Sequence, residues 1–175
     1  MFQDKVVVVT GGAQGIGMCI ADEFRKAGAK VFVIDLQPGD HYVGDLSKKE
    51  VLQEFADHVI KTCGHIDILV NNAGINIPRL LVDEGNKYEL DEAVWDKVMN
   101  VNVKGVFLCA QAAGRVMVKQ GHGVIINMSS EAGLEGSEGQ SVYAATLHKE
   151  EANLLLAGIM LDTHNFTRSA GARTF

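Results

Sequence analysis

The stretch KVVVVTGGAQGIG, residues 5–17, decides the fold of this chain. Residues 5–10 form an unbroken run of mostly β-branched side chains, which is typical of a strand buried on both faces. Glycines follow, and residues 16–29 then place apolar side chains at helical spacing and end near Gly28. A buried strand, a glycine loop and a helix in this order predict the first crossover of a parallel sheet.

The same alternation continues along the chain. Further strands are predicted at 30–35, 41–46, 66–74 and 123–130. One helix is predicted to open at Ser47, with Glu50 completing a capping box, and a long helix covers roughly 91–118. This order predicts an α/β fold: a doubly wound, Rossmann-like parallel sheet of five strands with right-handed crossovers. We expect one domain, with the Rossmann part at 1–146 and an atypical helical tail at 147–175.

The composition excludes several classes of protein. The 175 residues are 47% hydrophobic and 22% charged, which favours a globular protein over a disordered one. A net charge of −6 argues against a nucleic-acid partner, and the six histidines lack the spacing of a metal site. The sequence shows no targeting segment, no membrane-length apolar run and three cysteines without a pairing pattern. We therefore expect a cytoplasmic protein without membrane contact.

The glycine loop has the chemistry of a dinucleotide site. Gly11 allows a sharp turn, Gly15 lets the backbone approach a pyrophosphate at the helix N-terminus, and Gly17 lets the helix pack on the strand. Asp35 ends the second strand 18 residues after Gly17, where a carboxylate can accept hydrogen bonds from ribose hydroxyls. A turn before Pro38–Gly39 would also explain Asp35. Together these features indicate dinucleotide binding, and a carboxylate with no nearby cation in the sequence favours NAD over NADP.

Several motifs in the same order make residues 5–146 resemble the short-chain dehydrogenase/reductase family. TGGAQGIG at 10–17 is similar to the family's glycine loop, GDL at 44–46 to its adenine-contacting segment, and NNAG at 71–74 to its turn after the fourth strand. NVKG at 102–105 and NMSS at 127–130 resemble two further motifs. The resemblance implies that NAD contacts Gly11, Gln14, Gly15, Ile16, Gly17, Asp35, Asp45, Leu46, Asn72, Ala73 and Gly74.

The resemblance also implies a reaction. The family transfers hydride between a nicotinamide and a secondary alcohol or its ketone, so the expected partner is a small alcohol or ketone substrate. Tyr143 would be the acid/base, Ser130 would hold the substrate oxygen, and Asn102 would support a water relay. Ser129 and Asn100 are alternatives for the last two roles. A free tyrosine, with a pKa of about 10, is a poor base at neutral pH, and the family places a lysine beside it.

This chain departs from the family at that lysine. The position on the tyrosine's face of the helix holds Leu147, and Lys149 lies about 240° around the helix from Tyr143 at about 100° per residue. The family's last two strands and its substrate loop are also expected to be absent. The sequence therefore predicts an NAD-dependent oxidoreductase of doubtful turnover. The alternative is an impaired nucleotide-binding relative that acts as a regulatory or partner subunit.

The predicted helix at 91–118 carries more apolar side chains than one face of a sheet requires. The family pairs this helix across a two-fold axis, and the apolar run at 153–161 would otherwise be exposed. We therefore expect a homo-oligomer, a dimer or tetramer, built on Val98, Val101, Phe107, Cys109, Ala112 and Ala113.

Overall fold

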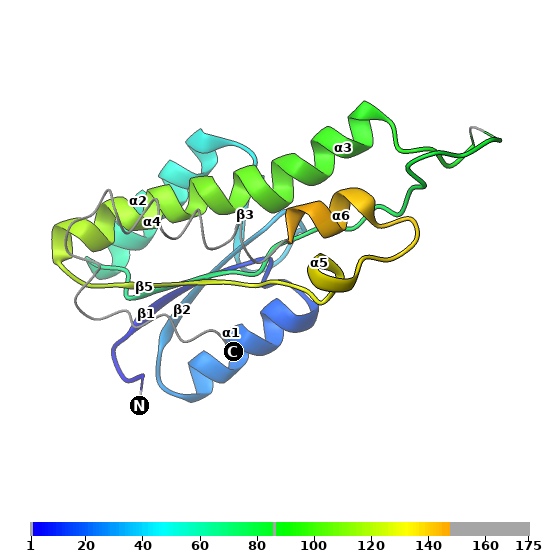
Figure 1. Ribbon diagram of the computed structural model, residues 1–175. Coiled ribbons are helices and arrows are strands. Elements are labelled where there is room, and N and C mark those ends of the chain that lie inside the picture. Colours follow the sequence, from blue (N-terminus) through cyan, green and yellow to red (C-terminus); the bar gives the residue numbers. More distant parts are fainter. Residues whose placement is uncertain (1, 86, 148–175) are drawn as a thin grey trace.

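The computed structural model describes residues 2–85 and 87–147, and its centre is a parallel sheet (Figure 1). The sheet has five strands in the order β3-β2-β1-β4-β5, and every pair is parallel. The strands are β1 Val6–Thr10, β2 Lys30–Asp35, β3 Tyr42–Val43, β4 Ile68–Asn71 and β5 Val124–Asn127. This confirms the doubly wound α/β fold that the sequence predicts.

Helices cover both faces of the sheet, as Figure 1 shows. Helix α1 (Gly15–Lys26) packs on one face, and α2 (Lys49–Cys63) and α4 (Val106–Gln120) pack on the other. Alternate residues of β1 enter the two cores, Val7 on the α1 side and Val8 on the α2 and α4 side. All five residues of β1 are buried, because the strand lies at the centre of the sheet with helices on both faces.

Several predicted boundaries are wrong. Strands β4 and β5 span 68–71 and 124–127 rather than the predicted 66–74 and 123–130. Strand β3 has two residues rather than the predicted six, and α2 begins at Lys49 rather than directly after Ser47. The Asp45 carboxylate accepts the backbone N–H of Ser47 at 2.9 Å, so the chain makes an aspartate turn before the helix. The N-cap is therefore Lys48, which makes no side-chain capping bond, and the expected Ser47–Glu50 capping box does not form.

The long helix predicted at 91–118 is present but changes its winding in the middle. It runs as α3 (Glu92–Met99), a π-helical segment η1 (Asn100–Gly105) and then α4. Asp91 caps its start by accepting the N–H of Val94 at 2.7 Å. Two short helices follow β5, α5 (Ala132–Glu135) and α6 (Ser141–Thr146), and they pack on each other near α3 (Figure 1).

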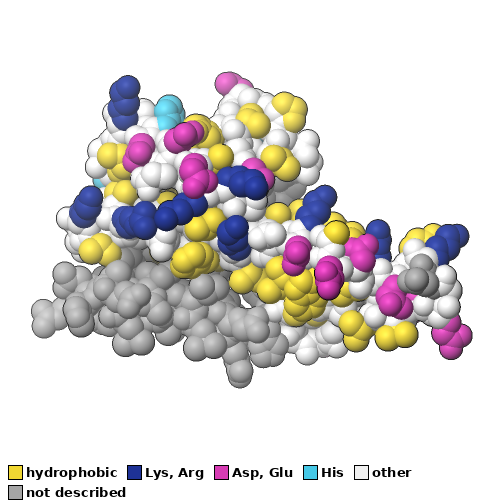
Figure 2. All heavy atoms as spheres, turned by 90° about the horizontal axis from the view of Figure 1, so that it is seen from above, with side chains coloured by type: hydrophobic (Ala, Val, Ile, Leu, Met, Phe, Trp, Pro, Cys, Tyr) yellow, Lys and Arg dark blue, Asp and Glu magenta, His cyan; other side chains and the backbone are white. Residues whose placement is uncertain are grey.

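The apolar residues of this long helix divide between the core and the surface. Val98, Cys109 and Ala113 are buried inside the domain, so their hydrophobicity does not require a partner chain. Trp95 and Phe107 remain about two-fifths exposed, at 41% and 42%. Figure 2, which looks onto the α2 and α4 face, shows hydrophobic side chains among charges of both signs there.

Within residues 2–85 and 87–147 no helix has the length and hydrophobicity to cross a membrane. Within the same ranges no cluster of three or more His, Cys, Asp or Glu side chains could hold a metal ion. The tail predicted at 147–175 is described only at Leu147. The rest of it, with its apolar run at 153–161, and the expected loss of two strands concern residues outside the described part of the chain.

Candidate active site

The site lies at the carboxyl ends of β1 and β4, where the strand order changes direction. In doubly wound sheets ligands bind in the crevice at this position. Thr10 joins the two strand ends here, because its Oγ1 accepts the backbone N–H groups of Asn72 and Ala73, both at 3.0 Å. The Asn72 side chain donates in return to the carbonyl oxygens of Thr10 and Gly11, both at 3.1 Å. The floor of the crevice is thus a closed hydrogen-bond network.

Helix α1 is pressed against this network at Gly17. A Cβ atom on Gly17 would overlap the carbonyl oxygen of Gly11 and the Nδ2 of Asn72. Gly11 itself has φ of 66° and Gly15 has φ of 56°, a region that residues with a side chain rarely adopt. Gly11 therefore lets the loop turn sharply and Gly17 lets the helix pack against the strand ends, as the sequence predicts.

The amino end of α1 is free to take an anion. Its N-cap residue, Gln14, makes no side-chain capping bond, and its first turn holds no acidic residue. The first N–H groups of a helix lack intrahelical partners and carry partial positive charge. This arrangement fits the pyrophosphate of a dinucleotide.

Asp35 lies at the end of β2, beside the glycine loop. One carboxylate oxygen accepts the N–H of Ala13 at 3.0 Å, and the other accepts the N–H of Gln37 at 3.0 Å. These bonds fix the carboxylate at the rim of the cleft, and each oxygen keeps a further lone pair for a ligand hydroxyl.

Asp45 also lies on the cleft and stays ionised. Burial alone would raise the pKa of its carboxyl, but hydrogen bonds from the backbone N–H and hydroxyl of Ser47 and the nearby Lys48 and Lys104 charges together lower that pKa.

One cleft of about 990 Å³ collects nearly all of the predicted cofactor contacts. Gly15 is not part of its lining. The residues that line it include Gly11, Gln14, Ile16, Gly17, Asp35, Asp45, Leu46, Asn72, Ala73 and Gly74.

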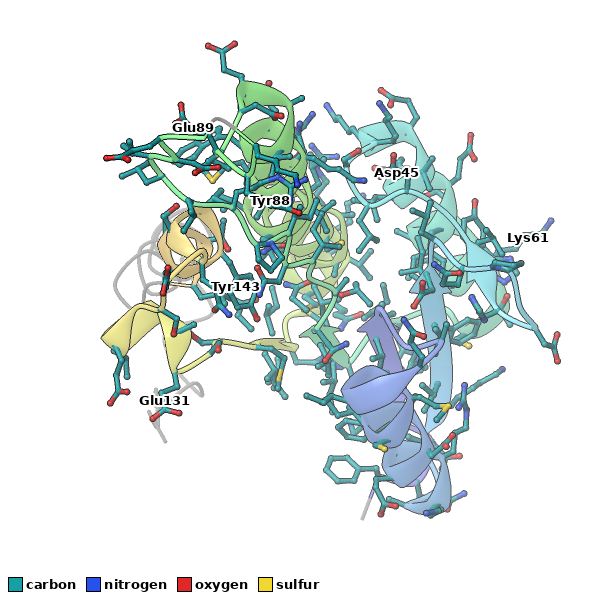
Figure 3. The ribbon with its side chains drawn as sticks, turned by 90° about the vertical axis from the view of Figure 1, so that its right-hand side faces the viewer. Asp45, Lys61, Tyr88, Glu89, Glu131 and Tyr143 are labelled. Atoms are coloured by element: carbon teal, nitrogen blue, oxygen red, sulfur yellow. The ribbon has the colours of Figure 1, made fainter. Side chains whose placement is uncertain are left out.

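A second pocket of about 880 Å³ adjoins the first and contains Tyr143. Four residues line both spaces: Ile16, Asn72, Ala73 and Gly74. The two spaces therefore share a wall and adjoin each other as the two parts of the candidate groove. Figure 3 looks onto this end of the sheet and shows Tyr143 and Asp45 on its opposite sides.

Asn102 is buried and ties three segments together. Its Oδ1 accepts the N–H of Ile75 at 2.8 Å, and its Nδ2 donates to the Ile75 carbonyl and to the Thr146 hydroxyl, both at 3.0 Å. Thr146 donates to the carbonyl of Tyr143 at 2.8 Å. Asn102 belongs to the π-helical segment, a conformation that occurs frequently at functional sites. The side chain thus fixes α6 against the loop after β4, and it lines the Tyr143 pocket, whereas the alternative residue Asn100 does not.

The two candidate serines take different positions. Ser130 is not among the residues that line the Tyr143 pocket, and its Oγ accepts the N–H of Ala132 at 3.3 Å. Ser129, the alternative, lines the pocket and donates to the carbonyl of Leu147 at 2.9 Å. The sequence alone could not separate the two, because the turn after β5 decides which hydroxyl faces inward.

Leu147 lines the pocket where the family resemblance leads one to expect a lysine. Among the described residues that line this pocket, none carries a charge. Lys149 lies outside the described part of the chain.

Sequence reasoning missed three residues of this site. Thr10 and Thr146 complete the two networks, yet single hydroxyls show no periodicity, and their partners lie 62 and 44 residues away. Asn71 donates to Asn127 at 2.9 Å, while its own buried Oδ1 has no hydrogen-bond partner among the described residues. Its place as the first residue of the NNAG motif was the available signal.

Comparison with known proteins agrees with this geometry. The family model described as short chain dehydrogenase matches residues 5–150. Sorbitol-6-phosphate 2-dehydrogenase of Klebsiella pneumoniae is 53% identical over 82% of this chain and 58% of its own length. The 3-oxoacyl-[acyl-carrier-protein] reductase FabG of Thermotoga maritima is 38% identical over 82% of this chain and 63% of its own. The NAD-dependent glycerol dehydrogenase of Listeria innocua is 36% identical over 82% and 59%. The chain thus spans about three-fifths of the length of these relatives.

Proposed function

The chain belongs to the short-chain dehydrogenase family, and we propose that it is an oxidoreductase that uses NAD to interconvert a secondary alcohol and its ketone. The observation that carries this proposal is the groove made by these two adjoining spaces. Its first part is lined by the predicted dinucleotide contacts and its second part by Tyr143 and Asn102, with Asn72 to Gly74 shared between them. Such a groove suits a dinucleotide whose reactive end lies beside an acid/base.

The residues of the cleft favour NAD over NADP. The free amino end of α1 suits the pyrophosphate, and the Asp35 carboxylate suits two ribose hydroxyls. A 2′-phosphate in the same place would meet the carboxylate, and like charges repel. When bound, the cofactor accepts or gives the hydride, and the chain supplies the proton transfer.

In this proposal Tyr143 transfers the proton. Its phenol would take the proton of the substrate hydroxyl during oxidation and return it during reduction. Ser129 or Ser130 would donate a hydrogen bond to the substrate oxygen. Asn102 would hold α6, and with it the tyrosine, at a fixed distance from the loop after β4.

The names of the relatives suggest the substrate class. The relatives at 53% and 36% identity are named for the oxidation of sorbitol 6-phosphate and of glycerol, which are both polyols. We therefore favour a polyol, and a phosphorylated polyol first.

A single-turnover assay tests the proposal. NADH formation is followed with sorbitol 6-phosphate, sorbitol and glycerol for the native chain and for Tyr143→Phe. We expect Tyr143→Phe to lower the rate about 10²–10⁴-fold, the usual contribution of acid–base catalysis. The control is Tyr88→Phe, because Tyr88 is 56% exposed and does not line the groove. Equal rates for native and Tyr143→Phe chains would refute the role of the tyrosine.

One observation favours a second candidate function, in which the chain binds a dinucleotide but does not catalyse a reaction. Leu147 occupies the pocket wall, and no charged side chain joins Tyr143 among the described residues lining that pocket. In the single-turnover assay this candidate predicts tight NADH binding and no NADH formation with any alcohol.

A further inference from the structure

The connection between β4 and α3 passes beside the segment that leads into α6. Its contact point is Arg79, whose backbone N–H donates to the carbonyl of Gly139 at 2.8 Å. Arg79 also forms an isolated parallel bridge with Gln140. Bridged neighbours lie about 5 Å apart, and Tyr143 is one helical turn beyond Gln140. The Cα atoms of Arg79 and Tyr143 therefore lie within roughly 10 Å of each other.

The side chain of Arg79 carries a charge that no carboxylate neutralises among residues 2–85 and 87–147, since no ion pair within 4.0 Å involves it there. The residue is half-buried, and within the described part of the chain its guanidinium donates one hydrogen bond, to the carbonyl of Pro78 at 2.8 Å. A guanidinium has five N–H donors, so most remain available. The Tyr143 pocket has no charged group among its described lining residues, and Arg79 approaches it through the backbone contacts to Gly139 and Gln140 rather than as a lining residue.

We propose that Arg79 binds the phosphate of a phosphorylated polyol and makes the chain prefer it over the free polyol. This inference rests on the proposed function. Arginine binds phosphate through two parallel hydrogen bonds, which gives both strength and orientation. In sorbitol 6-phosphate four carbons separate the reacting C2 centre from the phosphate oxygen. That spacing and the length of an arginine side chain together span the distance from Tyr143 to Arg79.

The carboxylates on the two connections do not reverse this preference. Glu131, Glu135 and Glu138 lie between β5 and α6, Glu84 and Glu89 lie between β4 and α3, and all five are exposed. Asp83, also between β4 and α3, already accepts the backbone N–H groups of Gly85, Lys87 and Tyr88. Water and salt screen exposed charges over about 8–10 Å, whereas a guanidinium in direct contact with phosphate is screened much less.

Calorimetric titration of the full chain tests the inference. NADH is titrated first, and sorbitol 6-phosphate and sorbitol are then titrated into the NADH-bound protein. We expect the native chain to bind sorbitol 6-phosphate at least tenfold more tightly than sorbitol. Arg79→Gln should weaken sorbitol 6-phosphate binding about 10–100-fold, the range of a lost charge-assisted hydrogen-bond pair, and leave sorbitol and NADH unchanged. Arg79→Lys should keep part of the preference.

The control is Arg115→Gln, because Arg115 is exposed on α4 and bonds Gln53 and Gln111 away from the groove. Thermal unfolding checks that the Arg79→Gln variant folds. We expect it to fold, because the contacts of Arg79 with Gly139 and Gln140 are made by its backbone. A native chain that binds NADH but does not prefer sorbitol 6-phosphate overturns the inference, and so does an Arg79→Gln variant that keeps the preference. Loss of NADH binding in the native chain would instead overturn the proposed function.

Discussion

Replacing Gly17 with alanine should damage the fold and the cofactor cleft together. The new Cβ would overlap the Gly11 carbonyl oxygen and the Asn72 Nδ2, so the loop or the side chain has to move. Both groups belong to the network that joins β1 to β4. Helix α1 cannot retreat without exposing Ala21, which is fully buried against the sheet.

The cost follows from these contacts. Overpacking costs about 1–3 kcal/mol, and each Asn72 hydrogen bond that is lost costs about 0.5–1.5 kcal/mol. Alanine in a helix recovers about 0.5–1 kcal/mol relative to glycine. The net loss is therefore about 2–4 kcal/mol, which corresponds to a fall in melting temperature of roughly 5–15 °C for a chain of this size.

Gly114→Ala is the matched control. Gly114 also lies inside a helix, α4, but among the described residues no atom outside the neighbouring turns of its own helix lies within 4 Å of the position of its added Cβ. The same substitution there should raise stability by about 0.5–1 kcal/mol. Urea unfolding followed by circular dichroism, together with NADH titration, measures both variants. If the Gly17→Ala variant has the same urea midpoint of unfolding as the native chain and binds NADH with the same affinity, the close packing of α1 on the loop does not form the cleft.

Three further predictions concern the pocket, the surface and the amino end of the sheet. Leu147→Lys should raise the single-turnover rate by up to about 10²–10⁴-fold, most strongly at low pH, because a nearby ammonium favours the phenolate of a tyrosine. If the native chain already reacts as fast as the Leu147→Lys variant, another group supplies the positive charge. The native chain should sediment as a homo-oligomer at micromolar concentration. The Phe107→Lys variant should sediment as a smaller species, because the exposed Phe107 ring lies on the long helix. A monomeric mass for the native chain would refute this prediction. Asp67→Asn should lower the free energy of unfolding at pH 7 by about 1–3 kcal/mol. Burial alone would raise the pKa of the Asp67 carboxyl, but bonds from the Val6 N–H and the Lys5 ammonium together lower it, so its stabilisation is complete above about pH 4 and is lost as the pH falls further. The native chain should therefore lose stability in acid, and the variant less so, in unfolding curves recorded between pH 2 and 7; parallel curves would contradict this.

The sequence could predict features that depend on local pattern. The run at 6–10 is buried on both faces, and the glycine loop, Asp35 and the NNAG turn meet in one cleft, because parallel strands bring their carboxyl ends to the same edge. The family motifs supplied Tyr143 and Asn102, which the structure brings to one pocket.

Features that depend on distant partners could not be predicted in this way. The π-helical turn at Asn100–Gly105 has the composition of an ordinary helix, and its winding is accompanied by bonds from Asn102 to Ile75 and Thr146. The choice between Ser129 and Ser130 depends on the turn after β5. The capping box at Ser47 failed because Asp45, two residues earlier, takes the Ser47 N–H first.

The central claim is that the groove binds NAD through the glycine loop and Asp35. Fluorescence titration of NADH and NADPH into the native chain, Asp35→Ala and Asp40→Ala tests it most directly. Asp40→Ala is the control, because it removes the same charge from the same connection at an exposed position outside the cleft lining. We predict that the native chain and Asp40→Ala bind NADH at least tenfold more tightly than NADPH, about 1.4 kcal/mol, and that Asp35→Ala narrows this difference. Equal affinities for the two cofactors in the native chain, or no binding of either, would contradict the account.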